Sequence, residues 1–387
     1  MKQTNMSKKT SIHKILPVFF AFYVMGFVDI VGVATGYIKL EFQLSDTLTQ
    51  MLTMMIFVWF AILSIPVGVF QDKRGKKNTV NLGIILTGIG MLIPLVWYSY
   101  YSMLCSFIFL GIGNTIIQVS ANPLMQDVSS ADKLSRNLTL SQFVKAIAGT
   151  LGPVIAAFCA VQFGNWTYIY WVYLAISVVS VLWLSSTKIE ETKDAKSASI
   201  SGALKLLADK KVALLVLGTF LMVGFDVGMN TNIVNYMKTQ FAVSQEEASI
   251  GISIYFAALM IGRFLSAIVL NWISSNKMFV YCTALAVLSF ALLFFMPSPV
   301  TGQIAVFLIG LFSASLFPLI FATGLRYLPQ RANEISGLMI MSVCGGAIIP
   351  PVIGILNDAF GLMTGMILLL ACLVYVVYLS FYAYSRY

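Results

Sequence analysis

The chain has 387 residues, of which 59% are hydrophobic and only 10% charged, and its formal net charge is +9. Soluble globular proteins carry about 25% charged residues, so this composition excludes a soluble globular protein. A positive net charge is also typical of nucleic-acid-binding proteins, but the sequence contains no compact basic face with interleaved aromatic residues. The composition therefore predicts an integral membrane protein without a nucleic-acid partner.

Apolar segments of about 20 residues or more recur along the chain, and each is long enough to cross ~30 Å of hydrocarbon as a helix. The first is too long for a cleaved signal peptide and lacks a small-residue cleavage site, so we expect it to be retained. We predict twelve spans, at residues 15–38, 50–71, 79–98, 102–126, 138–162, 166–186, 212–237, 247–272, 277–296, 302–326, 335–357 and 361–385.

A polar connection divides these spans into two sets of six. We therefore predict an all-α integral membrane fold with four parts: an N-terminal segment (1–14), a six-helix bundle (15–186), a linker (187–210) and a second six-helix bundle (211–387).

The basic residues define an orientation. When the connections are assigned alternately to the two sides of the membrane, 20 of the 24 Lys and Arg residues fall on one side. The other side carries only Lys39 and Lys238, and Lys145 and Arg263 lie within spans. Because positively charged connections stay on the cytoplasmic side, we expect both termini and the linker to be cytoplasmic.

The two halves resemble each other at an offset of about 199 residues, which is typical of transporters built from structural repeats. The similar pairs occur in the same order in both halves. They are GFVDIVG (26–32) with GFDVGMN (224–230), EFQLS (41–45) with QFAVS (240–244), GIG at 111 with GLF at 310, and GTLGPVIA (149–156) with AIIPPVIG (347–354).

Several motifs carry a resemblance to a known family. They are QVSANP (118–123), SRNLTLSQ (135–142), IVNY (233–236), GRF (262–264), GGAIIP (345–350) and QDKRGKK (71–77). With them the chain resembles the major facilitator superfamily over essentially all twelve spans, and within it the fucose–galactose–hexose symporter family. This resemblance implies two pseudo-symmetric bundles that carry a monosaccharide by alternating access with a coupled proton or sodium ion. It also implies that Asp72 and Arg74 form a gating loop at the cytoplasmic end.

The chain departs from that family at two places. Members usually carry an Asn-Asp pair in the first span, where this chain has Gly32 and Val33; Asp29 lies one helical turn earlier. Relatives often carry Asn at the position of Lys145. We therefore expect the coupling carboxylate to be displaced and the sugar site to have gained a cation.

Four charged residues lie deep within the predicted spans: Asp29 and Lys145 in the first half, and Asp226 and Arg263 in the second. An unpaired charge at mid-membrane costs several kcal/mol, ~2.5–3.5 on insertion scales, so pairing within each half is expected. Each pair is either a fixed tie between helices or a pair that opens when a proton or substrate binds. Since His13, the only histidine, precedes the first span, a carboxylate must carry any coupled proton.

Amide side chains both donate and accept hydrogen bonds, which suits a ligand rich in hydroxyl groups. Buried amides also hold helices together, so either role fits each of them. The predicted substrate-binding residues are Gln118, Asn122, Gln142, Lys145, Asn230 and Asn232.

These features predict a monomeric transporter in a bacterial inner membrane that imports a monosaccharide or derivative, with a proton as the coupling ion. The alternatives are an anionic sugar such as a uronate or sialic acid bound by Lys145, sodium coupling, facilitated uniport, and a sugar sensor that binds without transport. We expect no enzyme, metal site or organic cofactor, because the sequence shows no nucleophile–base set, metal-ligand cluster or nucleotide loop.

Overall fold

The computed structural model describes residues 12–44, 46–192 and 198–384, and these ranges consist of helices joined by short turns and connections. Most of the predicted N-terminal segment 1–14 and the middle of the linker, 193–197, lie outside the described residues.

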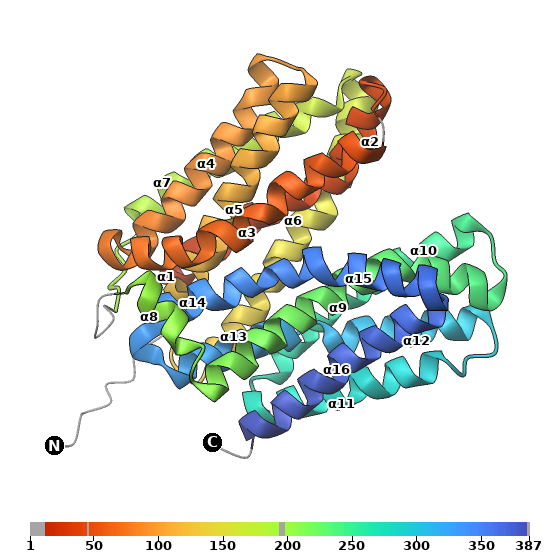
Figure 1. Ribbon diagram of the computed structural model, residues 1–387. Coiled ribbons are helices and arrows are strands. Elements are labelled where there is room, and N and C mark those ends of the chain that lie inside the picture. Colours follow the sequence, from red (N-terminus) through yellow and green to blue (C-terminus); the bar gives the residue numbers. More distant parts are fainter. Residues whose placement is uncertain (1–11, 45, 193–197, 385–387) are drawn as a thin grey trace. The chain divides into compact units, whose positions relative to one another are not determined.

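Twelve helical segments within the described ranges are long and apolar enough to cross a membrane, which confirms the predicted spans. Figure 1 labels the α-helices. They are α1 (Ile12–Met25), α2 (Val31–Glu41), α3 (Asp46–Arg74), α4 (Lys76–Val96), α5 (Tyr100–Val128), α6 (Leu134–Phe163), α7 (Ile169–Ser186), α8 (Ile200–Leu206), α9 (Lys210–Phe241), α10 (Gln245–Val269), α11 (Ser275–Leu293), α12 (Pro299–Ser313), α13 (Leu316–Tyr327), α14 (Ala332–Met341), α15 (Gly345–Phe360) and α16 (Leu362–Tyr384).

Local sequence explains where several of these helices begin. Ser99 caps α5, because its side chain accepts a hydrogen bond from the Ser102 backbone N–H and the Ser102 hydroxyl accepts one in return. Asp209 caps α9 by accepting from the backbone N–H groups of Lys211 and Val212. Such caps satisfy N–H groups that the first helical turn leaves without partners.

Within the described residues, three of the spans are interrupted. A 3₁₀ helix, Gly26–Ile30, separates α1 from α2 in the first span. The tenth span is divided into α12 and α13, and a second 3₁₀ helix, Ser342–Cys344, separates α14 from α15 in the eleventh. Short 3₁₀ stretches within a helix often mark hinges.

The chain forms two compact units. Unit 1 comprises residues up to 137, 141–205 and 325–341, and unit 2 comprises 138–140, 206–324 and 342 onward. The segment Leu325–Met341 belongs to unit 1 because α14 packs on α3 and α5, although it follows the linker in sequence.

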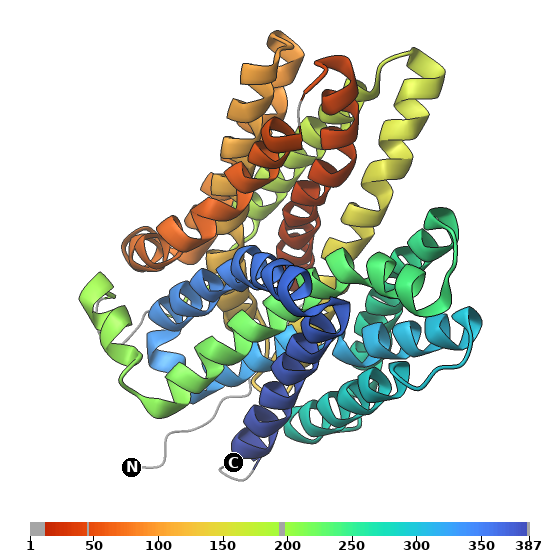
Figure 2. The same ribbon diagram turned by 45° about the vertical axis from the view of Figure 1, so that its right-hand side comes forward.

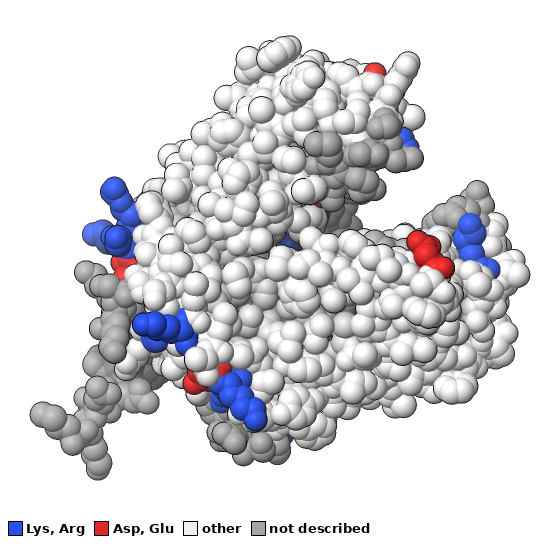
Figure 3. Space-filling model, in the orientation of Figure 1, with Lys and Arg blue, Asp and Glu red and all other residues white. Residues whose placement is uncertain are grey.

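Within unit 1, α5 packs along α4 and α3, and α1 lies against α5 and α7. Within unit 2, α9 and α16 run side by side, as do α11 and α16 (Figures 1 and 2). The long flanks of both units carry few charged side chains on the face shown in Figure 3, and the charges gather near helix ends. This distribution suits helices whose middle portions face hydrocarbon.

Candidate functional site

Asp29 lies in the 3₁₀ break of the first span, and its side chain is exposed within the described structure. The chain stays helical into α2, because Ile30 and Val31 both have right-handed helical backbone angles and the Val31 N–H donates to the Val28 carbonyl oxygen. Asp29 therefore lies where the winding of the helix changes, and such 3₁₀ stretches often mark functional hinges. Of the two positions at which the family resemblance would place an Asn-Asp pair, Gly32 has no side chain, and the side chain of Val33 lies outside the described part.

The first span crosses α6 at the 3₁₀ segment Gly26–Ile30. A Cβ atom at Gly26 would overlap the backbone carbonyl oxygen of Lys145 and would lie 2.7 Å from the Ala148 Cβ. A Cβ at Gly149 would lie only 2.6 Å from Asp29 Oδ2. The carboxylate of Asp29 therefore rests over Gly149, one helical turn beyond Lys145.

Asp29 and Lys145 are both described, and no ion pair joins them in this structure. The side chain of Lys145 is half-buried and that of Asp29 exposed. Asp29 and Lys145 therefore lie at the same helix crossing but form no ion pair in this structure.

A buried tyrosine adjoins this crossing. The ring of Tyr173 stacks on Phe27 with a centroid separation of 3.8 Å. Its hydroxyl lies over Gly152, because a Cβ there would come within 2.8 Å of it. This hydroxyl is buried and has no hydrogen-bond partner in the described part of the chain, an uncommon condition for a buried polar group. Nothing in the sequence distinguishes Tyr173 from other aromatic residues of its span.

The residues of α6 that take part in these contacts lie on one face of the helix. Gln142, Lys145, Gly149 and Gly152 are spaced three and four residues apart, so they lie along the same side of the helix. Gln142 is buried at one end of this stripe. The stripe places an amide and an ammonium group on the face that also meets Asp29 and the Tyr173 hydroxyl.

The amides of α5 form a buried chain. Asn114 Nδ2 donates to the carbonyl oxygen of Met25 at 2.9 Å, and Gln118 Nε2 donates to Asn114 Oδ1 at 2.9 Å. Asn122 Nδ2 donates to the carbonyl oxygen of Gln118 at 2.6 Å. This chain ties α5 to α1 at the residue before the 3₁₀ break. Gln118 and Asn122 therefore already hold protein partners in this structure.

In unit 2, the Tyr255 hydroxyl on α10 donates a hydrogen bond to Asp226 Oδ1 on α9 at 2.8 Å. Arg263, two turns further along α10, is near enough for its positive charge to act on the same carboxylate. Asp226 therefore takes part in the packing of α9 against α10. This arrangement is what a fixed tie between helices requires.

The two predicted asparagines of α9 differ in their surroundings. Asn230 is half-buried, whereas Asn232 is buried and donates to the Gly228 carbonyl oxygen at 2.8 Å. Asn232 Oδ1 also accepts a hydrogen bond from Asn357 Nδ2 at 3.0 Å. Asn357 is a site candidate that the sequence reasoning missed, since it lies near the end of an otherwise apolar span.

The predicted gating loop lies where α3 ends. Asp72 Oδ1 accepts from Asn333 Nδ2 at 3.1 Å, and Asp72 Oδ2 accepts from the backbone N–H of Ala198 at 3.0 Å. Asp72 therefore contacts both α14 and the linker within unit 1. Arg74 is exposed at the end of α3.

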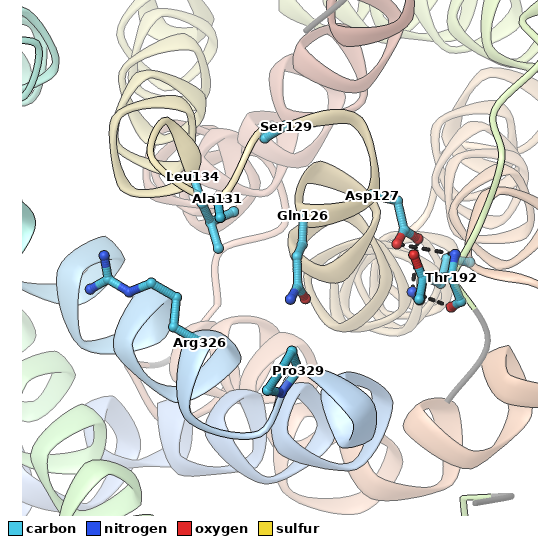
Figure 4. A pocket seen from close by; sticks show the side chains of 9 residues that line it. Gln126, Asp127, Ser129, Ala131, Leu134, Thr192, Arg326 and Pro329 are labelled. Carbon is cyan, nitrogen blue, oxygen red and sulfur yellow. Dashed lines mark hydrogen bonds and ion pairs between the residues drawn. The ribbon is translucent and has the colours of Figure 1, made fainter. Parts of the chain in front are cut away.

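A buried ion pair near this loop was also missed. Lys76 Nζ lies 2.7 Å from Asp127 Oδ2, and both side chains are 3% exposed. The linker residue Thr192 joins the pair: its carbonyl oxygen accepts from Lys76, and its N–H donates to Asp127 (Figure 4). The pair borders a cavity of about 330 Å³ that Gln126 and Arg326 also line.

Comparisons with known proteins agree with this architecture. The chain is 26% identical to a glucose/galactose transporter of Brucella abortus over 380 residues, covering 92% of this chain and 90% of that protein. It is 23% identical over 362 residues to an L-fucose-proton symporter of Escherichia coli, covering 83% of this chain and 82% of that protein. These relatives are named as transporters and not as enzymes.

Solved structures show the same fold. The crystal structure of the Escherichia coli fucose:proton symporter superposes with a TM-score of 0.85 at 18% identity, covering 97% of this chain and 99% of that one. A bacterial homologue of the iron transporter ferroportin superposes with a TM-score of 0.81 at 12% identity, covering 97% and 100%. The family model described as Major Facilitator Superfamily matches residues 16–351 and, in a second match, 215–386. With matches that run through both halves, the chain belongs to the Major Facilitator Superfamily.

Proposed function

We propose that this protein is a secondary active transporter that imports a neutral monosaccharide by alternating access, with a proton as the coupling ion. The observation that carries the proposal is the crossing of the first span with α6. There an exposed carboxylate, Asp29, lies in a helix break and faces the stripe that carries Gln142 and Lys145. The names of the relatives, which include glucose/galactose, glucose/mannose and fucose transporters, support a sugar as the cargo.

Asp29 is the proposed proton carrier. Within the described part of the chain it makes no ion pair with Lys145, so protonation does not have to break an existing bond. The unpartnered hydroxyl of Tyr173 and the ammonium group of Lys145 lie on the same face and can bond to the carboxylate or to substrate in turn. Protonation neutralises the Asp29 carboxylate in the 3₁₀ segment of the first span. In this proposal, that loss of charge couples proton binding to the conformational change of alternating access.

The amides supply the proposed sugar contacts. The hydrogen bonds among Asn114, Gln118 and Asn122 leave further acceptor and donor positions on each amide. A sugar that bonds to Gln118 adds to this chain and does not need to replace it. In unit 2 we assign the corresponding role to Asn230 and Asn232, and to Asp226 and Arg263 a structural tie.

We further propose that the protein lies in the cytoplasmic membrane of a bacterium as a monomer, with both termini inside. The distribution of Lys and Arg supports this orientation. Asp72 is the proposed gating residue at the cytoplasmic end, where it bonds to Asn333 and to the linker at Ala198.

Counterflow in proteoliposomes tests this function. The purified protein is reconstituted with a panel of neutral and acidic monosaccharides inside, and uptake of the labelled sugar is followed. We expect counterflow of at least one neutral hexose and, under an inward proton gradient, its accumulation. The Asp29→Asn variant should retain counterflow but lose gradient-driven accumulation, because it can no longer carry the proton.

The alternatives give different results. Counterflow restricted to acidic sugars would replace the neutral substrate by an anionic one bound at Lys145. Accumulation that requires sodium at fixed pH would replace the coupling ion, and sugar binding without any flux would indicate a sensor. Full accumulation by Asp29→Asn would exclude Asp29 as the coupling carboxylate.

A further inference from the structure

Unit 2 contains a cavity of about 630 Å³ with both polar and apolar lining residues, most of which have no predicted role. It is lined by the last turns of α9, by the second half of α15 and by the start of α16, and its polar lining includes Asn235, Lys238, Thr239, Asn357 and Asp358. Its volume falls within the range of roughly 300–1,000 Å³ in which proteins bind small molecules. By the distribution of basic residues, this end of unit 2 faces away from the cytoplasm.

One amide of the cavity wall, that of Asn357, is held in position. Asn357 Nδ2 donates to Asn232 Oδ1 at 3.0 Å, and Asn357 Oδ1 accepts from the Gly365 backbone N–H at 3.0 Å. Asn232 is 6% exposed and is itself fixed by the Gly228 carbonyl oxygen. An amide has two N–H groups and two acceptor positions, so Asn357 keeps one of each for a ligand. A fixed amide binds a ligand with little loss of conformational freedom.

The charges on the cavity wall favour a neutral ligand. Lys238 and Asp358 contribute one charge of each sign, and the other lining side chains are uncharged. A carboxylate accepts hydrogen bonds from hydroxyl groups, whereas an ammonium group donates hydrogen bonds to them. Pro350, Pro351 and Gly354 form a wall without polar side chains, which suits the C–H face of a sugar ring.

We propose that this cavity is a recognition subsite for the hydroxyl groups of a neutral monosaccharide, formed by unit 2 alone and entered from the extracytoplasmic side. Asn357 and Asp358 bond to neighbouring hydroxyls, and the ring lies on the Pro350–Gly354 wall. The inference rests on the proposed sugar transport, but it concerns residues outside the predicted site apart from Asn232.

Gly354 offers a direct test. A Cβ atom at this position would meet nothing within 4 Å, so Gly354→Leu fills the cavity without displacing a neighbour. A suitable control is Gly36→Leu, because Gly36 on α2 is likewise surrounded by open space but belongs to unit 1. We expect Gly354→Leu to raise the KM for counterflow of the best neutral sugar about tenfold while the maximal rate changes little. The control should leave KM unchanged.

A second cavity variant and a binding measurement separate a loss of sugar recognition from a loss of folding. Asp358→Ala removes an exposed carboxylate, and we expect a rise in KM of about threefold. Sugar-induced stabilisation of the purified protein against heat should weaken in both cavity variants but not in Gly36→Leu. If the wild type transports a sugar and both cavity variants keep its KM and its thermal stabilisation, the subsite is excluded while the proposed function stands. If the wild type neither transports nor is stabilised by any sugar, the proposed function and the subsite both fail.

Discussion

The pair Lys76–Asp127 is the most completely buried ion pair in the described part of the chain, and it joins α4, α5 and the linker. Both charged side chains are almost fully buried at a separation of 2.7 Å, and Thr192 satisfies further positions on each. Glu191, the preceding residue, accepts from the backbone N–H groups of Lys76 and Lys77 at the start of α4. The linker is therefore bound to unit 1 by charge as well as by main-chain hydrogen bonds.

Removing one partner of this pair should destabilise the protein more than removing both. Lys76→Met leaves Asp127 buried without its counter-charge, and such losses cost about 3–5 kcal/mol. The double variant Lys76→Met with Asp127→Leu removes both desolvated charges and should recover most of the loss. Thermal unfolding in detergent measures both effects. Equal destabilisation by the single and double variants would show that the charges do not interact.

At the residue scale, the sequence predicts which side chains are unusual better than which of them meet. The cost of charge in a membrane identifies Asp29 and Lys145 individually, and they share a helix crossing. It does not predict the Asn357–Asn232 hydrogen bond, the place of the Tyr173 hydroxyl over Gly152 or the Lys76–Asp127 ion pair. Such contacts depend on how helices are rotated and displaced against each other, and span length and composition do not determine that.

At the element scale, the crossing of α3 with α14 brings two backbones into direct contact. A Cβ atom at Gly68 would lie 2.6 Å from the Asn333 carbonyl oxygen, and one at Gly337 would lie 2.9 Å from the Ser64 carbonyl oxygen. The Ser336 hydroxyl donates to the carbonyl oxygen of Val119 on α5 beside this crossing. A close approach between backbones cannot be relieved by a change of side-chain rotamer.

Gly337→Val should therefore separate α3 from α14. The added atoms meet main-chain atoms of Ser64 and Ile65, so the helices must move apart or the variant must favour a state in which they no longer touch. Spin labels at Lys73 and Gln330, which are both exposed, report their separation by pulsed electron resonance in a background without native cysteines. We expect a larger population at long distances than in the wild type. A distance distribution identical to that of the wild type, or of a Gly36→Val control, would contradict the interpretation.

The number of spans followed from the sequence, whereas their interruptions did not. Hydrophobic length identifies a helix that crosses a membrane, and all twelve predicted spans are present in the described structure. The 3₁₀ segments Gly26–Ile30 and Ser342–Cys344 have nearly the same residue period as the helices they interrupt. In the sequence they therefore look like parts of continuous helices, and only the structure shows that Asp29 lies in a 3₁₀ segment.

At the scale of the whole molecule, the distribution of basic residues is the feature that predicts the orientation in the membrane. Of the 24 Lys and Arg residues, 20 lie in connections or termini that alternate spans assign to one side. Basic residues close to span ends are retained in the cytoplasm during insertion, and this bias is repeated at every second connection. A single missed span would have reversed the assignment of all later connections and removed the asymmetry.

Reporter fusions check this orientation. Green fluorescent protein fused after Tyr387 should fluoresce, because the C-terminus is expected inside the cell. Alkaline phosphatase, whose disulfides form only outside the cytoplasm, should be active when inserted at Gly361 between α15 and α16 and inactive when inserted at Ala131 between α5 and α6. The two insertion sites are both exposed connections, so they differ chiefly in the side of the membrane they face. Activity at Ala131 with none at Gly361 would show that the protein has the opposite orientation in the membrane. The cavity lined by Asn357 and Asp358 would then open toward the cytoplasm as a site of substrate release.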